Sequence, residues 1–252
     1  MTRFRPPGFV TEYLNKRARK KLVSQIKFPY DIDAPILPDD VKPELERLLP
    51  RLPDEPKFSA GVRMTREDLP EHKLYFSKEK RLGYSNYSKA QASLYKISEG
   101  EVKQGHVDEL WKTLDSDWER VFQTYRVPKG ATMRYRNNDG LYHPSSSFPL
   151  HEAIDVFMPK VFDILNSEDK GIHAIEKAIL LHHMVVWLHP YPDGNNRLAM
   201  LLMKLKLMRS GFPLVAVDVD KKRYFETLNQ AHGGNITPFA KLMAKGIISS
   251  AL

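Results

Sequence analysis

The spacing of apolar residues in the second half of the chain predicts a series of helices. Between residues 106 and 125, apolar side chains recur every three or four positions, which is the repeat of one helical face. Residues 172–188 carry apolar side chains on most faces, as expected of a central helix that is buried on all sides. Further helices are predicted at residues 150–166, 195–209, 221–231 and 238–249. The fold class expected from this pattern is all-α, or mainly helical.

The first hundred residues carry a weaker pattern. Residues 12–26 form a predicted basic helix with an irregular apolar stripe. Prolines recur through residues 29–70 and favour an irregular segment, which is interrupted by one short helix at residues 42–49. A loop at residues 84–87 is predicted to lead into a helix at residues 88–97.

These patterns divide the chain into an N-terminal extension, residues 1–105, and a helical domain, residues 106–252. Inside that domain, residues 134–143 predict a short β-hairpin, because Asp139 and Gly140 tolerate the positive φ of tight hairpin turns. An ordinary surface hairpin and a functional one remain alternatives from these residues alone.

Residues 188–197 place several polar side chains between two predicted helices. Pro190 and Pro192 end the first helix, because proline lacks a backbone N–H and displaces the preceding residue from the α region. Gly194 and Asn195 can adopt positive φ and begin the next helix, whose free N–H groups and positive dipole end attract anions. This connection is therefore predicted to bind phosphate.

Three side chains of the connection suit phosphate chemistry. Asp193 offers a hard oxygen ligand of the kind that Mg²⁺ prefers. Arg197 can bind a phosphate through its planar guanidinium group. The usual pKa of a histidine, about 6.5, suits His189 to act as a general base at neutral pH. Each residue alone is ordinary turn or cap chemistry, whereas the combination favours a functional site.

The connection also resembles the active-site signature of the Fic domain family, whose motif reads His-Pro-Phe-x-Asp/Glu-Gly-Asn-Gly-Arg-x-x-Arg. In this chain Tyr191 takes the place of the Phe, Asn196 that of the last Gly, and Met200 that of the second Arg. Most members of the family transfer AMP from ATP to a hydroxyl group of a target protein. The resemblance, which spans roughly residues 106–245, implies a Fic-type helical core with the hairpin as a flap over the active site.

The resemblance further implies what each residue does. His189 would take the proton of the target hydroxyl, Arg197 would balance developing charge, and Asp193 would hold Mg²⁺ on the phosphates of ATP. The residues implied to bind the nucleotide are Gly194, Asn195, Asn196, Arg197 and Tyr224. The flap residues implied to dock the target segment are Tyr135, Arg136, Leu141 and Tyr142.

Two other functions compete with transfer of AMP. Relatives that carry Lys in place of the last motif Gly bind the nucleotide inverted and transfer phosphate, and Asn196 is neither residue. A non-catalytic interaction protein that keeps the fold is the other alternative, and Met200 supports it because the second Arg is lost. The retention of His189, Asp193, Asn195 and Arg197 together opposes it.

Two features outside the motif carry expectations of their own. His182 and His183 are neighbours on one helix, point in different directions and lack a third ligand, so a structural role is expected rather than a metal site.

Many Fic proteins are inhibited by a Glu in Ser/Thr-x-x-x-Glu-Gly/Asn that pairs with the second motif Arg. The nearest match here is Glu99, but Tyr95 takes the place of the Ser/Thr and Met200 removes the cationic partner. Glu99 is therefore expected to end a helix and not to inhibit.

Composition sets the remaining expectations. The net charge is +8, and residues 1–27 hold eight Lys and Arg against one Glu, a local excess of seven. Nucleic acid, an acidic protein surface or an anionic membrane could match this arm, although a solvated basic helix is the favoured interpretation. The chain has no Cys, no apolar run of about 18 residues and no signal-like start, so a cytoplasmic protein without a transmembrane span is expected.

Overall fold

The computed structural model describes residues 24, 26–43, 81–114, 152–168, 172–191 and 194–251. In these ranges the regular secondary structure is helical. The helices are α5 (Arg81–Ser98), α6 (Gln104–Leu114), α8 (Glu152–Asn166), α9 (Ala174–Leu188), α10 (Asn195–Arg209), α11 (Lys221–His232) and α12 (Thr237–Ala251). These ranges contain no strand, and the mainly helical prediction is confirmed. The predicted hairpin, residues 134–143, lies outside the described residues.

The helix at the start of the described core begins earlier than the sequence pattern predicts. Residues 84–87 are helical and belong to α5, so the predicted loop is wrong. Tyr87, Ala90 and Leu94 are fully buried and lie three and four positions apart, which continues one apolar face back through this stretch. Burial of that face outweighs the turn-like composition of the residues before it.

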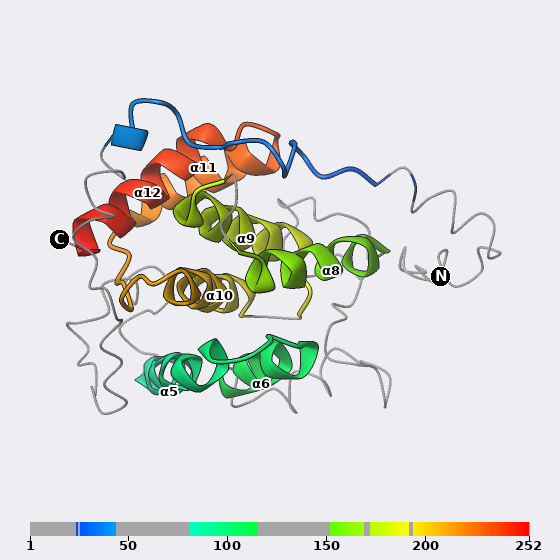
Figure 1. Cartoon of the computed structure of the whole chain (residues 1–252), viewed down its shortest axis with the longest axis vertical. Helices are drawn as coiled ribbons and strands as arrows, with labels where there is room; N and C mark the ends of the chain where they lie inside the picture. Colours follow the sequence, from blue (N-terminus) through cyan, green and yellow to red (C-terminus); the bar gives the residue numbers. More distant parts are fainter. Residues whose placement is uncertain are drawn as a thin grey trace, which may run out of the picture.

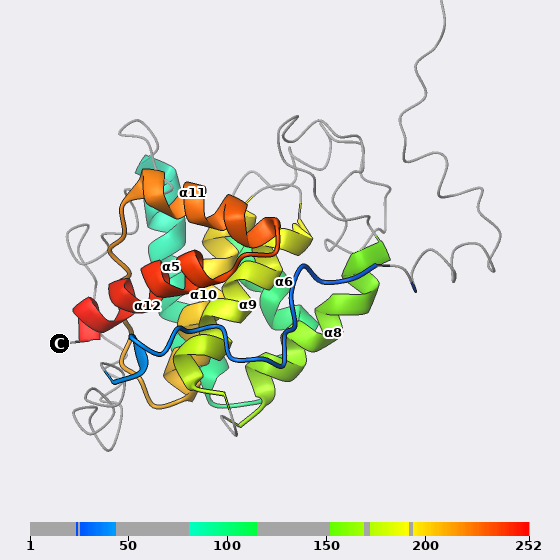
Figure 2. The ribbon, with the colours of Figure 1, turned by 90° about the horizontal axis from the view of Figure 1, so that it is seen from above.

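Helix α9 lies at the centre of the bundle, with α11 and α12 on one side and α10, α5 and α6 on the other (Figure 1). Viewed from above, α8 extends beside α9 (Figure 2). Every residue of α9 is buried except Lys177. This confirms the prediction that residues in this stretch form a helix surrounded by protein, and it gives a rigid support to the loop that follows its last residue.

Helix α10 is tied to its neighbours by long cationic side chains. The fully buried Lys204 donates to the Gln91 side chain of α5 at 2.8 Å. At the C-terminal end of α10, Arg209 donates to the carbonyl oxygens of Ser98 and Leu165, at 3.0 and 3.1 Å, and to that of Gly100. These contacts hold the ends of α5 and α8 against the end of α10.

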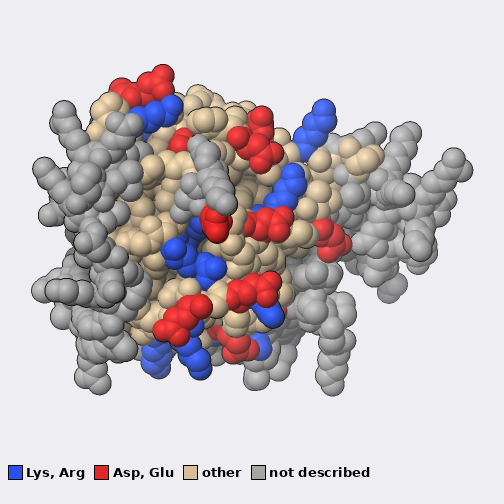
Figure 3. Space-filling model, viewed as in Figure 1, with Lys and Arg blue, Asp and Glu red and all other residues tan. Residues whose placement is uncertain are grey.

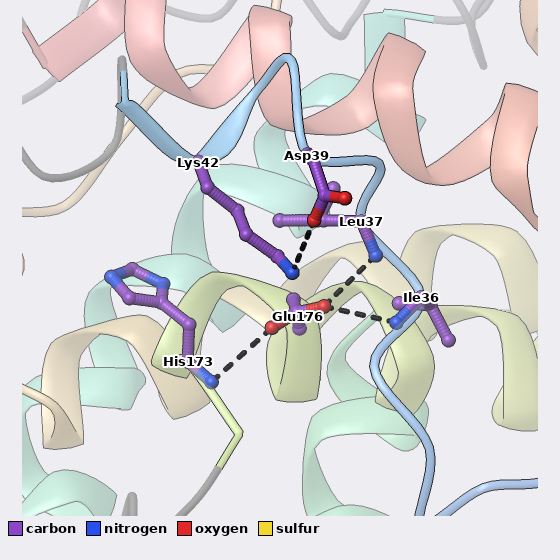
Figure 4. Close-up of polar contacts among 6 residues, drawn as sticks. All are labelled: Ile36, Leu37, Asp39, Lys42, His173 and Glu176. Carbon is purple, nitrogen blue, oxygen red and sulfur yellow. Dashed lines mark hydrogen bonds and ion pairs between the residues drawn. The ribbon is translucent and has the colours of Figure 1, made fainter.

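Residues 26–43, here called the strap, run along α9 and α12. Figure 4 shows the central contact, in which the backbone N–H groups of Ile36 and Leu37 donate to one carboxylate oxygen of Glu176, at 2.9 and 2.8 Å. Glu176 is buried in the first turn of α9 and its other oxygen accepts from the backbone N–H of His173 at 3.4 Å. A carboxylate at this end of a helix is favoured by the dipole as well as by these donors.

The core includes side chains from both sides of the predicted boundary at residue 105. Leu37 and Val41 of the strap and Leu94 of α5 are buried in the same cluster as the central helices. The boundary itself stays a prediction.

Acidic and basic side chains are intermixed on the face of the molecule that Figure 3 shows. The described part of this face therefore carries no continuous field of one sign. None of the helices within the described ranges is long and apolar enough to cross a membrane. Residues 1–23 of the basic arm lie outside those ranges, so the partner of the arm stays a prediction.

Candidate active site

The end of α9 turns sharply at His189. This residue has φ 49° and ψ 55°, and its backbone N–H donates to the carbonyl of Val185 at 3.0 Å. It is the only non-glycine residue with positive φ in the described part of the chain, a conformation that costs an ordinary residue about 1–2 kcal/mol. Pro190 follows and cannot continue the helix. The half-buried His189 side chain is thus fixed at the boundary between a rigid helix and a turn.

The side chain of Asn195 closes the turn from inside. Its Oδ1 accepts from the backbone N–H of Tyr191 at 2.9 Å, and its Nδ2 donates to the carbonyl of the same residue at 2.7 Å. Asn195 is buried, so both bonds are shielded from water. The sequence points to the backbone amide of Asn195 as a phosphate donor, and the structure adds this second role for its side chain.

Helix α10 begins at Gly194 without a side-chain cap. Gly194 has φ 78°, and a Cβ atom there would lie 3.3 Å from Arg197 Nη2 and 3.6 Å from Trp111 Nε1. The first intrahelical bond runs from Leu198 to the Gly194 carbonyl, at 2.9 Å. The backbone N–H groups of Asn195 and Asn196 precede it in the first turn, where N–H groups have no acceptor within the helix. A helix start of this kind suits an anion, and phosphate binding here stays a prediction.

Arg197 lies beside that helix start. Its Nη2 atom is the nearest group to the position of a Gly194 Cβ, and its Nη1 donates to the carbonyl of Leu114, the last residue of α6, at 3.4 Å. The guanidinium group is therefore close to the free N–H groups and adds positive charge at the same place.

Tyr191 joins the turn to α6. Its ring stacks on Trp111 with centroids 5.0 Å apart and planes 12° apart. Its hydroxyl donates to Asp108 Oδ1 at 2.5 Å, and Gln104 Nε2 lies 3.2 Å from the same hydroxyl. Burial, reinforced by the negative charge of Asp108, raises the pKa of the Tyr191 hydroxyl well above its usual value. The α6 residues are not among the site residues predicted from the sequence.

The remaining predicted site residues divide into three groups. Asn196 is half-buried, and its Oδ1 atom is buried with no hydrogen-bond partner. Tyr224 is fully buried, with its hydroxyl 3.2 Å from His182 Nε2. Asp193 and the four flap residues Tyr135, Arg136, Leu141 and Tyr142 lie outside the described residues. The structure therefore brings together His189, Gly194, Asn195, Asn196 and Arg197.

The two adjacent histidines of α9 lie inside the bundle, and their structural role stays a prediction. Both are fully buried, and His183 accepts or donates at each ring nitrogen, to the Tyr30 hydroxyl at 2.6 Å and to His232 Nδ1 at 3.0 Å. Burial, together with the charge that His232 would carry, lowers the pKa of His182 to about 3 and that of His183 well below its usual value. Within the described ranges no group of three or more His, Asp or Glu side chains could hold a metal ion.

Comparison with known proteins identifies similar sequences and folds. The Fic/DOC family model matches residues 101–207. "Protein adenylyltransferase Fic" of Nematostella vectensis is 44% identical over 99 residues, which are 38% of this chain and 23% of the relative. "Protein adenylyltransferase fic-1" of Caenorhabditis elegans is 41% identical over 87 residues, which are 34% of this chain and 17% of the relative. The matched stretch thus spans less than a quarter of these curated relatives.

One solved structure extends the comparison to the fold. It is a histidine-to-alanine variant of IbpAFic2 in complex with adenylylated Cdc42, and it superposes with a TM-score of 0.56 at 16% identity. The superposition covers 95% of this chain and 83% of that chain. The likeness therefore includes α5 and the strap as well as the residues that the family model matches.

Proposed function

We propose that this chain, whose residues 101–207 match the Fic/DOC family model, is a protein adenylyltransferase that moves AMP from ATP to a Ser, Thr or Tyr hydroxyl of a target protein. The observation that carries the proposal is the turn itself, which places His189 at the end of a buried helix and the uncapped start of α10 on its other side. The names of the two relatives, and the adenylylated Cdc42 bound to IbpAFic2, support the same reaction.

The residues of the turn fit a nucleotide triphosphate. The start of α10 offers backbone N–H groups without a side-chain cap, Gly194 leaves no Cβ to crowd them, and Arg197 adds a guanidinium group. When bound, Mg·ATP would supply the AMP group and a diphosphate leaving group. Asp193, the one carboxylate of the motif, has the oxygen chemistry that suits Mg²⁺.

His189 would act as the general base. It removes the proton of the target hydroxyl while the hydroxyl oxygen bonds to the α-phosphorus, and the bond from that phosphorus to the oxygen that bridges to the β-phosphate breaks. Arg197 and the N–H groups of the first turn of α10 neutralise charge on the departing pyrophosphate. The proton ends on His189, and from there it passes to solvent.

Three parts of the proposal rest on the sequence resemblance. Residues 134–143 would align the target segment by strand-like pairing, with Tyr135, Arg136, Leu141 and Tyr142 as the contacts. Tyr224 would lie near the nucleotide base, which requires its buried ring to line the wall of the pocket rather than project into it. A cytoplasmic location is part of the same expectation.

The experiment uses ATP that carries a radioactive label on either the α- or the γ-phosphate. The purified chain is incubated with each donor and Mg²⁺, alone and with a cell lysate, and labelled proteins are separated on a gel. Only the α-label should be incorporated, and His189→Ala should lower the rate by roughly 10²- to 10⁴-fold. His189→Asn is the matched variant, because Asn tolerates the left-handed conformation better than Ala and equally lacks the base.

Other outcomes decide against the proposal. Incorporation of the γ-label alone would indicate phosphotransfer, which the presence of Asn196 in place of the family Gly leaves as the second candidate. An absence of either label, together with no ATP binding in calorimetry, would indicate a non-catalytic interaction protein. Equal rates for wild type, His189→Ala and His189→Asn would show that another group is the base.

A further inference from the structure

We propose that Tyr191 is a positioning residue, whose hydroxyl bond to Asp108 holds the phosphate-binding turn against α6. The motif of the family has Phe at this place, which cannot form such a bond. The catalytic consequence of this proposal rests on the proposed function, whereas the effect on the turn does not.

One face of α6 supports the turn at three levels. Asp108 accepts from the Tyr191 hydroxyl, Trp111 stacks on the Tyr191 ring, and the Leu114 carbonyl accepts from Arg197. These α6 residues follow one another at intervals of three, so they lie along one side of the helix. The turn therefore rests on a single rigid element, and the hydrogen bonds from Tyr191 and Arg197 hold it there.

The link continues from Tyr191 to the start of α10. The side chain of Asn195 bonds both the N–H and the carbonyl of Tyr191, and Asn195 is also the first residue of α10. A shift of the Tyr191 ring therefore displaces the backbone to which Asn195 is bonded. The same shift moves the free N–H groups of α10 relative to His189, two residues before Tyr191.

The hydrogen bond from Tyr191 to Asp108 belongs to the strong, charge-assisted class. The tyrosine side chain is fully buried and its partner is a carboxylate, and hydrogen bonds to charged groups are shorter and stronger than those between neutral groups. Gln104 Nε2 donates to the same Asp108 oxygen at 2.7 Å, which fixes the carboxylate in place. Removal of the tyrosine hydroxyl leaves this carboxylate with one donor fewer at the buried side.

The motif of this chain carries one Arg where the family motif carries two, which makes the position of the turn matter more. Met200, where the family motif has its second Arg, is fully buried and brings no charge to the phosphates. Arg197 is then the motif's one guanidinium group, and α6 also contacts it. A small displacement of the turn therefore changes the alignment of a phosphate for which the motif supplies no second Arg.

The test compares Tyr191→Phe with a matched control, Tyr30→Phe. Tyr30 is a tyrosine of the strap whose hydroxyl makes a similarly short bond, 2.6 Å to His183 of α9, and whose ring packs on Phe28 and His183. Hydrogen exchange is followed by mass spectrometry on peptides that cover residues 189–197, and turnover is measured as a function of ATP concentration. Thermal unfolding of both variants reports the loss of stability that any buried hydroxyl causes.

Tyr191→Phe should speed exchange in residues 189–197 and lower turnover roughly tenfold, which corresponds to one charge-assisted hydrogen bond. Tyr30→Phe should leave both unchanged at a similar loss of melting temperature. Asp108→Ala should reproduce the effect of Tyr191→Phe, and the double variant should lose no more than either single variant.

Unchanged exchange and turnover in Tyr191→Phe would overturn the proposal, as would equal changes in Tyr30→Phe. If the wild type transfers no AMP, the proposed function fails on its own. The exchange comparison still decides whether Tyr191 holds the turn in place.

Discussion

Asn196 occupies the place of the last glycine of the Fic motif, and it brings a buried Oδ1 atom without a partner to the start of α10. An unsatisfied buried polar group costs about 1–3 kcal/mol. The oxygen also lies on a residue whose backbone N–H is expected to face phosphate, and a carbonyl-type oxygen repels an anion. Asn196 therefore bears directly on how well the turn accepts a nucleotide.

We predict that Asn196→Gly raises the affinity for Mg·ATP several-fold. The variant removes the side chain from the first turn, although glycine in a helix costs stability by about 1 kcal/mol, so the melting temperature should fall slightly. Calorimetric titration with ATP measures the affinity. Asn196→Ala is the control, because it removes the amide and keeps the Cβ atom. Weaker binding by both variants would show instead that the amide donates to the phosphates through its Nδ2 atom.

At the scale of elements, the far ends of α5 and α10 decide whether Glu99 can inhibit. Arg209 Nη1 donates to the carbonyls of Ser98 and Gly100, so Glu99 lies beside the last residue of α10. The phosphate-binding turn is at the first residue of the same helix. A helix of 15 residues spans about 22 Å, which no glutamate side chain can bridge.

Glu99→Gly should therefore leave ATP affinity and self-labelling unchanged. The exposed carboxylate faces solvent at the end of α5, so its loss removes no contact with the turn. Both quantities can be measured beside Glu99→Gln, which removes the charge and keeps the side-chain length. A rise of either quantity in the Gly variant would mean that the end of α5 moves toward the turn during the reaction.

The elements that the sequence predicts well are those whose pattern is local. The start and stop signals predict a helix at residues 195–209, and α10 has these bounds. Gly194 and Pro190 mark the turn because their conformational limits act within a few residues. The sequence pattern does not predict the start of α5, because only burial against distant helices reveals that Tyr87 belongs to its apolar face.

The contacts that the sequence does not reveal are long-range. The bond from Tyr191 to Asp108 joins residues 83 positions apart, and that from Leu37 to Glu176 joins residues 139 positions apart. A Tyr in place of the motif Phe is a signal that a hydroxyl needs a partner, but the spacing of residues cannot identify which carboxylate supplies it. Only the packing of α6 and the strap against the central helices answers this question.

At the scale of the whole molecule, a chain of buried and half-buried polar rings joins three parts of the fold. The Tyr30 hydroxyl of the strap bonds His183 of α9, which bonds His232 of α11, while His182 bonds Tyr224 of α11. Burial lowers the pKa of His232 to about 4, and the pKa of each α9 histidine is also lowered. All three rings are therefore neutral in the folded protein at neutral pH.

The stability of the molecule should fall as the medium becomes acidic. In the unfolded chain each histidine binds a proton below its usual pKa of about 6.5, whereas the folded state resists protonation until the lowered values are reached. The unfolded state thus binds more protons between these limits, and the free energy of unfolding rises with pH there. Between pH 6.5 and 5, one such histidine contributes a loss of at most about 2 kcal/mol.

We predict that His232→Asn makes the free energy of unfolding less sensitive to pH. Asn keeps a polar atom close to the position of the imidazole Nδ1, so the bond to His183 can be retained without the titrating ring. Urea unfolding at pH 7 and at pH 5 measures the difference for the wild type and the variant. The free energy of unfolding of the wild type should fall more than that of the variant over this interval. The difference should be at most about 2 kcal/mol, the contribution of one histidine. Equal losses would mean that His232 is protonated as readily in the folded protein as in the unfolded chain, and that the pH dependence arises from the two histidines of α9.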